Sequence, residues 1–463
     1  MTSDTSDTPS SQEPSRAAVP VPLAANPLAA PQALPTRRTA LLNARILDPS
    51  TNLDVRGDLF AEKGRIADFG PGIFPDGPPQ DALKIDCNGM VLAPGLVDMR
   101  VHLGEPGHEQ AETIASGAAA AVAGGITTLA SLPNTSPAID DVSLVEFIAR
   151  RARETKLVKI HPYAAVTRGL DGKALTEIGT MSRAGAVAFC DGDHWIADAL
   201  VMRRALAYAR NFDALIVQHP EEPSLAKGGL MTEGEMSSRL GMAGIPAEAE
   251  VIAVERDLRL LSLTGGRLHF AHVSTHAAID AIRKAKEAGL AVTCDTAPPY
   301  ALLNINAVGD YRTFAKLSPP LRTEDDRQSV LAGLADGTID ALASDHMPHD
   351  QDSKRLPFPA AAFGGVGMET LLSAALSLHH SGTMDLHKAL ALVTYKPADL
   401  LRVEAGRIAV GHPADLALID IDRGWKVSES SLRSKSKNSP FDGLPMTGRA
   451  VRTLVDGRTV YTA

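Results

Sequence analysis

Short apolar runs alternate with amphipathic or alanine-rich segments through the middle of this chain. The apolar runs have the length of buried strands, and the segments between them have helical periodicity. Repeated strand–helix units predict a parallel sheet, and eight of them close a (β/α)8 TIM barrel, an α/β fold. The first expected strand begins at Pro94, and the others span 126–132, 158–165, 186–191, 214–219, 267–273, 291–296 and 339–345. Expected helices include 112–123, 197–209, 247–263 and 277–288.

Polar residues stand at or just after the ends of these apolar runs. A single histidine of this kind is more often a hydrogen-bonded structural residue than a ligand. In a barrel, however, the carboxyl ends of all strands meet at one mouth, where the chemistry of this fold takes place. Because the polar residues keep one register with the strand ends, we predict that they converge on one site. They are Asp98, His102, Asn134, Asp191, His219, His272, Asp345, His346 and His349.

The types of these residues favour a metal-dependent hydrolase. Imidazole and carboxylate groups are good ligands for a divalent ion such as zinc. We expect Asp191, His219 and His272 to approach one cation, with His102 and Asp345 on the opposite wall. A bound metal lowers the pKa of a water molecule and polarises a carbonyl group. Asp345 is the candidate catalytic residue, which would take the proton of the attacking water and return it to a leaving nitrogen.

The first strand carries an arginine between two candidate site residues. Side chains alternate along a strand, so Asp98, Arg100 and His102 share one face and lie about 6–7 Å apart. A guanidinium stays protonated and has no lone pair, so Arg100 cannot bind a metal. We expect this fixed positive charge to lie near Asp345, Asp191 or Asp98.

The two ends of the chain differ from the middle. Residues 1–36 are rich in Ser, Thr, Ala and Pro, and we expect a disordered tail there. Short alternating strands and turns follow, and the same texture returns after Val403. We therefore predict one composite β-sandwich domain from 37–93 and 401–463, around a barrel spanning 94–400.

Composition restricts the environment and the partners. The 463 residues carry a net charge of −9, so neither a nucleic acid nor a membrane surface is an expected partner. We interpret the one basic run, at 433–437, as a solvated loop. Three widely spaced cysteines support neither a disulfide framework nor a cysteine zinc site, and a cytoplasmic location fits them best.

The motifs of the chain resemble the dihydroorotase family of the amidohydrolase superfamily, from about residue 39 to 460. The resemblance implies a zinc-dependent cyclic-amide hydrolase that interconverts carbamoyl aspartate and dihydroorotate in pyrimidine synthesis. It implies substrate-binding roles for Asn134, His349, Phe363 and Gly364. The matching segments are PGLVDM at 94–99, LPNT at 132–135, IVQH at 216–219, AHVST at 271–275, SPPLR at 318–322, SDHMPH at 344–349, GRIAVG at 406–411 and SKSKNSPF at 434–441.

The chain also departs from the family pattern. Arg100 stands where the family has a second metal-binding histidine, and Gly104 stands where it has the arginine that clamps the substrate carboxylate. Ser318 replaces an asparagine. Loss of an Arg–carboxylate contact removes on the order of 2–3 kcal/mol of substrate binding. We therefore expect at most one zinc ion, or none, and impaired activity.

The sequence leaves three functions open. The first is a dihydroorotase with one metal on Asp191, His219 and His272. The second is a non-catalytic dihydroorotase-like subunit that supports aspartate carbamoyltransferase, which Arg100 and Gly104 favour. The third is a hydantoinase-like or allantoinase-like hydrolase, but these relatives usually carry a strand-end lysine, which is absent from 186–193. We also expect a homo-oligomer.

Overall fold

The computed structural model describes residues 38–463, and the tail expected at 1–36 lies outside them. Eight parallel strands form one sheet in the order β15-β14-β13-β10-β9-β8-β7-β6. The sheet closes where Val101, at the end of β6, pairs in parallel with His346 after β15. The strands are β6 (Leu96–Val101), β7 (Ile126–Ser131), β8 (Lys159–Ala164), β9 (Ala188–Phe189), β10 (Leu215–Gln218), β13 (Arg267–Phe270), β14 (Val292–Thr296) and β15 (Ala341–Leu342). The α/β barrel predicted from the sequence is thereby confirmed.

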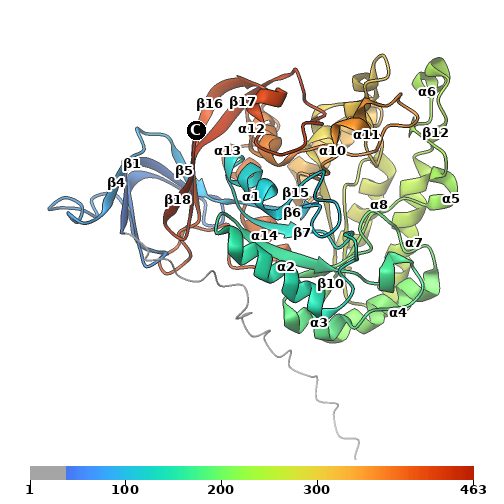
Figure 1. Cartoon of the computed structure of the whole chain (residues 1–463), viewed down its shortest axis with the longest axis horizontal. Coiled ribbons are helices and arrows are strands. Elements are labelled where there is room, and N and C mark those ends of the chain that lie inside the picture. Colours follow the sequence, from blue (N-terminus) through green and yellow to red (C-terminus); the bar gives the residue numbers. More distant parts are fainter. Residues whose placement is uncertain (1–37) are drawn as a thin grey trace, which may run out of the picture.

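Helices cover the outside of this barrel (Figure 1). The barrel helices are α1 (Ile114–Ala123), α2 (Val142–Thr155), α3 (Ile178–Ala184), α4 (Ala199–Ala209), α7 (Glu248–Thr264), α8 (His276–Glu287), α10 (Glu324–Asp336), α12 (Leu371–His380), α13 (Leu386–Ala391) and α14 (Tyr395–Leu401). Shorter elements lie in the loops: α5 (Pro223–Ala226), β11 (Met231–Thr232), α6 (Glu235–Leu240), β12 (Gly244–Ile245), α9 (Pro298–Leu302) and α11 (Gln351–Arg355).

Helix α1 shows why the sequence folds in this way locally. Thr113 caps its first turn, accepting a hydrogen bond from the Ser116 amide, and the Ser116 hydroxyl accepts one from the Thr113 amide. Ala118, Ala120, Ala121 and Ala123 are buried, and their small size lets the helix pack closely on β7.

The two chain ends build a second, mixed sheet beside the barrel. Figure 1 shows the N-terminal strands, in blue, next to the C-terminal strands, in red. The strand order is β18-β17-β16-β5-β1-β2-β3, with β4 paired to β1, so β16 joins the two ends of the chain by pairing with β5. The strands are β1 (Thr39–Asp48), β2 (Leu53–Glu62), β3 (Arg65–Gly70), β4 (Leu83–Asp86), β5 (Val91–Pro94), β16 (Leu416–Lys426), β17 (Pro445–Val455) and β18 (Arg458–Thr462).

The basic run at 433–437 keeps Arg433 and Lys435 exposed, as the sequence analysis expected of a solvated loop, but its serines are buried. The Ser434 hydroxyl and the Lys435 amide donate to the buried Glu112 carboxylate, and the Ser436 hydroxyl donates to the Ala111 carbonyl. The basic composition of the run does not reveal this role. The Lys437 ammonium donates hydrogen bonds to carbonyl groups of its own loop. The run therefore fastens the C-terminal segment to the loop before α1.

None of the helices found between residues 38 and 463 is long and apolar enough to cross a membrane.

A buried ion pair ties the barrel to the mixed sheet. The Lys159 ammonium, at the start of β8, lies 2.7 Å from Asp415 and 2.9 Å from Asp456. The Asp415 side chain is only 3% exposed, so loss of Lys159 would leave a buried charge without a partner.

We predict that Lys159→Met lowers the free energy of unfolding by about 3 kcal/mol, measured by urea denaturation. The matched control is Lys173→Met, because Lys173 pairs with Asp171 at 3.9 Å and its side chain is 83% exposed. This control should change stability by no more than about 0.5 kcal/mol. Equal effects of the two substitutions would contradict the structural role of Lys159.

Candidate functional site

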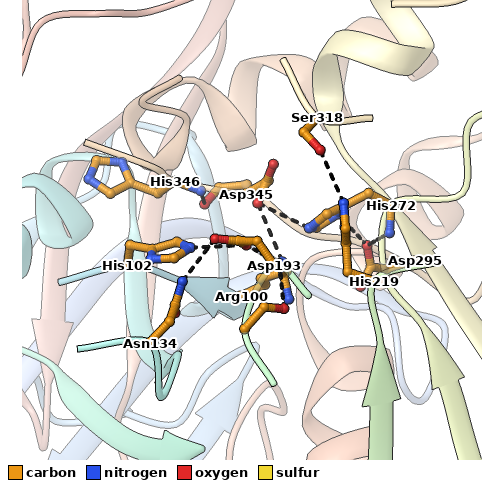
Figure 2. A network of polar contacts seen from close by, with 12 residues as sticks. Arg100, His102, Asn134, Asp193, His219, His272, Asp295, Ser318, Asp345 and His346 are labelled. Atoms are coloured by element: carbon orange, nitrogen blue, oxygen red, sulfur yellow. Dashed lines mark hydrogen bonds and ion pairs between the residues drawn. The ribbon is translucent and has the colours of Figure 1, made fainter. Parts of the chain in front are cut away.

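Charged and polar side chains from several strand ends meet at one mouth of the barrel (Figure 2). They come together because the carboxyl ends of parallel strands lie on the same side of a barrel. The group comprises Arg100 on β6, His102 after β6, Asn134 after β7, Asp193 after β9, His219 after β10, His272 after β13, Asp295 on β14, Ser318, and Asp345 after β15.

Arg100 lies at the centre of this group. Its Nη2 lies 2.6 Å from Asp193 Oδ1, and its Nε lies 3.4 Å from Asp345 Oδ1. The side chain is 2% exposed. Burial lowers the pKa of Arg100, but the Asp193 and Asp345 charges outweigh that effect and raise it, so the guanidinium stays charged. Asp98 contacts the Ser344 and Arg100 backbone amides instead of the guanidinium.

Asp193 is one of three site residues that the sequence analysis missed, together with Asp295 and Glu221. One of its oxygens lies 3.4 Å from His102 Nε2, and the other accepts a hydrogen bond of 2.8 Å from Asn134 Nδ2. Burial raises the pKa of Asp193, but the charges of His102 and Arg100 outweigh it, so the net shift is downward. The available signal was a second aspartate two positions after Asp191.

The structure places Asp191 outside the group that we expected it to join. Its carboxylate accepts hydrogen bonds from the Val166 amide (3.0 Å) and the Thr167 amide (2.9 Å), and also from the Thr167 hydroxyl. Gly192, with φ of +67°, turns the chain directly after it. Asp191 therefore joins the loops after β8 and β9, and Asp193 reaches the barrel mouth.

His272 lies between two carboxylates. Its Nε2 is 3.0 Å from Asp345 Oδ1, and its Nδ1 is 2.9 Å from Asp295 Oδ1. Burial lowers the pKa of His272, but Asp345 and Asp295 outweigh it and raise the pKa to about 9. For Asp345 the effects are reversed: burial raises its pKa, but the charges of His272 and Arg100 outweigh burial and bring the pKa below its ordinary value. Both shifts favour the charged form of each partner in this pair.

His219 contacts a different set of partners. Its Nε2 lies 3.1 Å from the Ser318 hydroxyl, which donates to Glu221 at 2.9 Å. Burial raises the pKa of Glu221, but the contacts with His219 and Ser318 lower it overall. Ser318, which we expected to stand in place of an asparagine, therefore connects His219 to the Glu221 carboxylate.

His349, Phe363 and Gly364 form a separate group beside this network. His349 Nε2 lies 2.5 Å from the Phe363 carbonyl, and Asn438 Oδ1 accepts from the His349 amide. Asn438 Nδ2 also donates to the Gly364 carbonyl. The structure thus brings these three expected substrate-binding residues together, whereas Asn134 joins Asp193.

A cleft of about 740 Å³ opens beside the network on the side of the loops after β9 and β10. Asp193, Trp195, Glu221 and Lys227 are among the residues that line it. His349 and Phe363 are not among the residues that line it.

The loop at Gly104 leaves no room for a side chain. Gly104 has φ of +67°, and a Cβ atom there would lie 2.6 Å from the Glu112 carbonyl oxygen and 2.8 Å from that of His108. These are backbone atoms, so they cannot turn aside as a side chain does. The loop conformation therefore requires glycine at position 104.

The side chains as placed do not fit a zinc ion. No three His, Cys, Asp or Glu side chains in the described part of the chain are grouped so as to hold a metal. His102 faces Asp193, His272 faces two carboxylates, and the Arg100 guanidinium lies between the acidic groups that a cation would need. Zinc binding requires neutral imidazoles and free carboxylate oxygens around one point.

Two known family models match parts of the chain. Residues 89–278 match the model described as dihydro-orotase-like, and residues 254–461 match the amidohydrolase family. A protein of Wolbachia sp. subsp. Brugia malayi named dihydroorotase is 44% identical, over 92% of this chain and 96% of its own. The chain belongs to the dihydroorotase family. A second family member, the protein of Anaplasma phagocytophilum named dihydroorotase, is 45% identical over 92% of this chain and 95% of its own.

Solved structures agree with this family's fold. The L-hydantoinase from Arthrobacter aurescens superposes with a TM-score of 0.81 at 26% identity, covering 92% of this chain and 96% of its own. The dihydropyrimidinase from Brevibacillus agri has a TM-score of 0.80 at 23% identity, covering 92% of this chain and 95% of its own. The second likeness supports the fold alone.

The partly buried position of His349 predicts a pH effect on this dihydroorotase-family chain. Burial, with the nearby Lys354 charge, lowers the pKa of His349 from 6.5 to about 4. In the unfolded chain His349 takes up a proton below pH 6.5, whereas in the folded chain it does so only near pH 4. The contribution of His349 to stability is therefore complete above pH 6.5 and is lost as the pH falls toward 4.

We expect the wild-type chain to lose more stability on acidification through this range than His349→Gln does, measured by urea denaturation at each pH. The exposed His194 provides the control, since His194→Gln should follow the wild-type curve. Parallel curves for the wild type and His349→Gln would show that His349 is not held neutral by burial.

Proposed function

We propose that the chain is a dihydroorotase-like protein of pyrimidine biosynthesis that acts on dihydroorotate and carbamoyl aspartate with impaired activity. Relatives named dihydroorotase match 92% of its length, which supports the substrate class. The position of Arg100 between Asp193 and Asp345 carries the proposal of a low rate. As a divergent member, the chain lacks one family histidine at Arg100 and the family arginine at Gly104.

The reaction needs a base beside the amide bond. Hydrolysis of dihydroorotate adds water to a ring amide carbon, breaks the C–N bond and returns a proton to the nitrogen. Asp345 is ionised, so it is in the correct form to take the proton. Its Oδ1, however, already faces both Arg100 and His272, and a carboxylate held by two cations is a weak base.

Substrate binding is weakened for a second reason. In the family pattern an arginine clamps the substrate carboxylate, and here the loop at Gly104 excludes that side chain. The Arg100 guanidinium does not offer a free pair of nitrogens in its place, because its Nε and Nη2 already face Asp345 and Asp193 and only Nη1 has no partner. Zinc would activate the water if it were bound, but the side chains as placed do not form its site.

We predict a dihydroorotate turnover at least about a hundredfold below that of a fully equipped dihydroorotase, because each 1.4 kcal/mol of lost transition-state stabilisation costs about tenfold. Ring opening and ring closure should be assayed by absorbance with the full chain. A relative that keeps the histidine and the arginine, purified and assayed in the same way, provides the control. Equal kcat/KM for the two proteins would contradict the proposal of impaired activity.

A non-catalytic role is the second candidate function. Arg100 and Gly104 both favour it, since the first takes up the acidic groups of the site and the second excludes the substrate clamp. In this role the chain would support aspartate carbamoyltransferase in the cytoplasm as part of a larger assembly.

The test mixes this chain with the aspartate carbamoyltransferase of the same organism. We expect the two to elute together in size-exclusion chromatography and the carbamoyltransferase to be more active or more stable in the mixture. Separate elution, with unchanged carbamoyltransferase activity, would contradict this second candidate. A hydantoinase-like activity is disfavoured because no lysine occurs between residues 186 and 193.

A further inference from the structure

The charges at the barrel mouth are compensated by the chain itself. Arg100 is 1% exposed and has carboxylates on two sides, at 2.6 Å and 3.4 Å. These belong to Asp193 and Asp345, which follow β9 and β15. The guanidinium therefore links two distant strand ends to β6, as a bridging metal ion links its ligands.

We propose that Arg100 is a built-in cation that replaces a metal ion at this barrel mouth, so that the chain folds and stays folded without zinc. This inference does not depend on the proposed function, since it concerns metal content and stability and not turnover. It identifies Arg100 as a structural residue that occupies a former metal position.

Three of the four carboxylate oxygens of Asp193 and Asp345 are already in contact with other side chains. Asp193 Oδ1 faces Arg100 and His102, and its Oδ2 accepts from Asn134. Asp345 Oδ1 faces Arg100 and His272. A divalent ion would have to displace these contacts and then lie beside a guanidinium that cannot lose its charge.

The strand geometry also indicates how a metal site could be restored. Arg100 near the end of β6 and His102 just after it both contact Asp193 Oδ1, so Arg100→His would place a second imidazole next to His102. The substitution would at the same time release Asp193 and Asp345. Together with His219 and His272 on the other side of the mouth, this would supply the nitrogen and oxygen ligands that zinc prefers.

The experiment measures zinc content and thermal stability in the full-length wild-type chain and in three variants. Arg100→His restores a ligand, Arg100→Met removes the charge without adding a ligand, and Arg204→His adds a histidine at an exposed position of α4 as the control. Each protein is purified without added metal and then titrated with zinc. Zinc is measured by elemental analysis, and Tm is measured with zinc and with a chelator.

We expect the wild type and Arg204→His to contain no stoichiometric zinc and to keep the same Tm with zinc or chelator. Arg100→Met should have a lower Tm that zinc does not restore. Arg100→His should bind about one zinc per chain and gain Tm with zinc, because a ligand that binds only the folded state stabilises it.

Stoichiometric zinc in the wild type that is lost in His219→Asn would overturn the proposal, as would a wild-type Tm that falls with chelator. Both of these outcomes are measured without Arg100→His, so the proposal stays open to refutation even if that variant does not fold. A normal turnover in a zinc-free wild-type chain would contradict the proposed function but leave this inference intact.

Discussion

The buried guanidinium of Arg100 and its two carboxylates are the interaction on which the barrel mouth depends. An isolated charge is costly to bury, and a charged group stays buried only when opposite charges and hydrogen bonds compensate it. Arg100 meets this requirement only if the loop after β9 and the segment after β15 are both in place. Barrel closure and charge compensation therefore depend on each other, since the bridge between Val101 and His346 brings Asp345 beside β6.

Charged groups far from the barrel mouth are also compensated by residues from distant parts of the chain. Lys159 compensates two aspartates of the mixed sheet, and Glu112 accepts hydrogen bonds from the segment at 434–435. Each contact joins residues hundreds of positions apart in the chain. The mixed sheet is thus tied to the barrel by buried charged groups as well as by packing, and its strands come from both chain ends.

The dihydroorotase family membership and the site geometry give different information. The relatives at 44–45% identity identify the fold and the substrate class that we propose. The geometry bears on the chemistry, because Asp345 has the ionisation state of a base but is held by two cations. A family fold can persist while its site changes, since the strand ends that carry the site are not the residues that pack the core.

The sequence by itself determined the barrel, the composite terminal β structure and most of the residues at the mouth. Strand periodicity and the strand-end register of His102, His219, His272 and Asp345 are local properties, and they are readable without coordinates. The positive charge of Arg100 at a site position was equally plain, because its chemistry does not depend on context.

Only the tertiary structure decided which carboxylate meets that charge. Asp191 and Asp193 are both near the end of β9, and the turn at Gly192 sends the second to the mouth and leaves the first with Thr167. The tertiary structure also decided that the basic run at 433–437 contacts Glu112 and that the loop at Gly104 has no room for a side chain. These outcomes depend on backbone direction and on neighbours far away in the chain, which residue type and spacing do not encode.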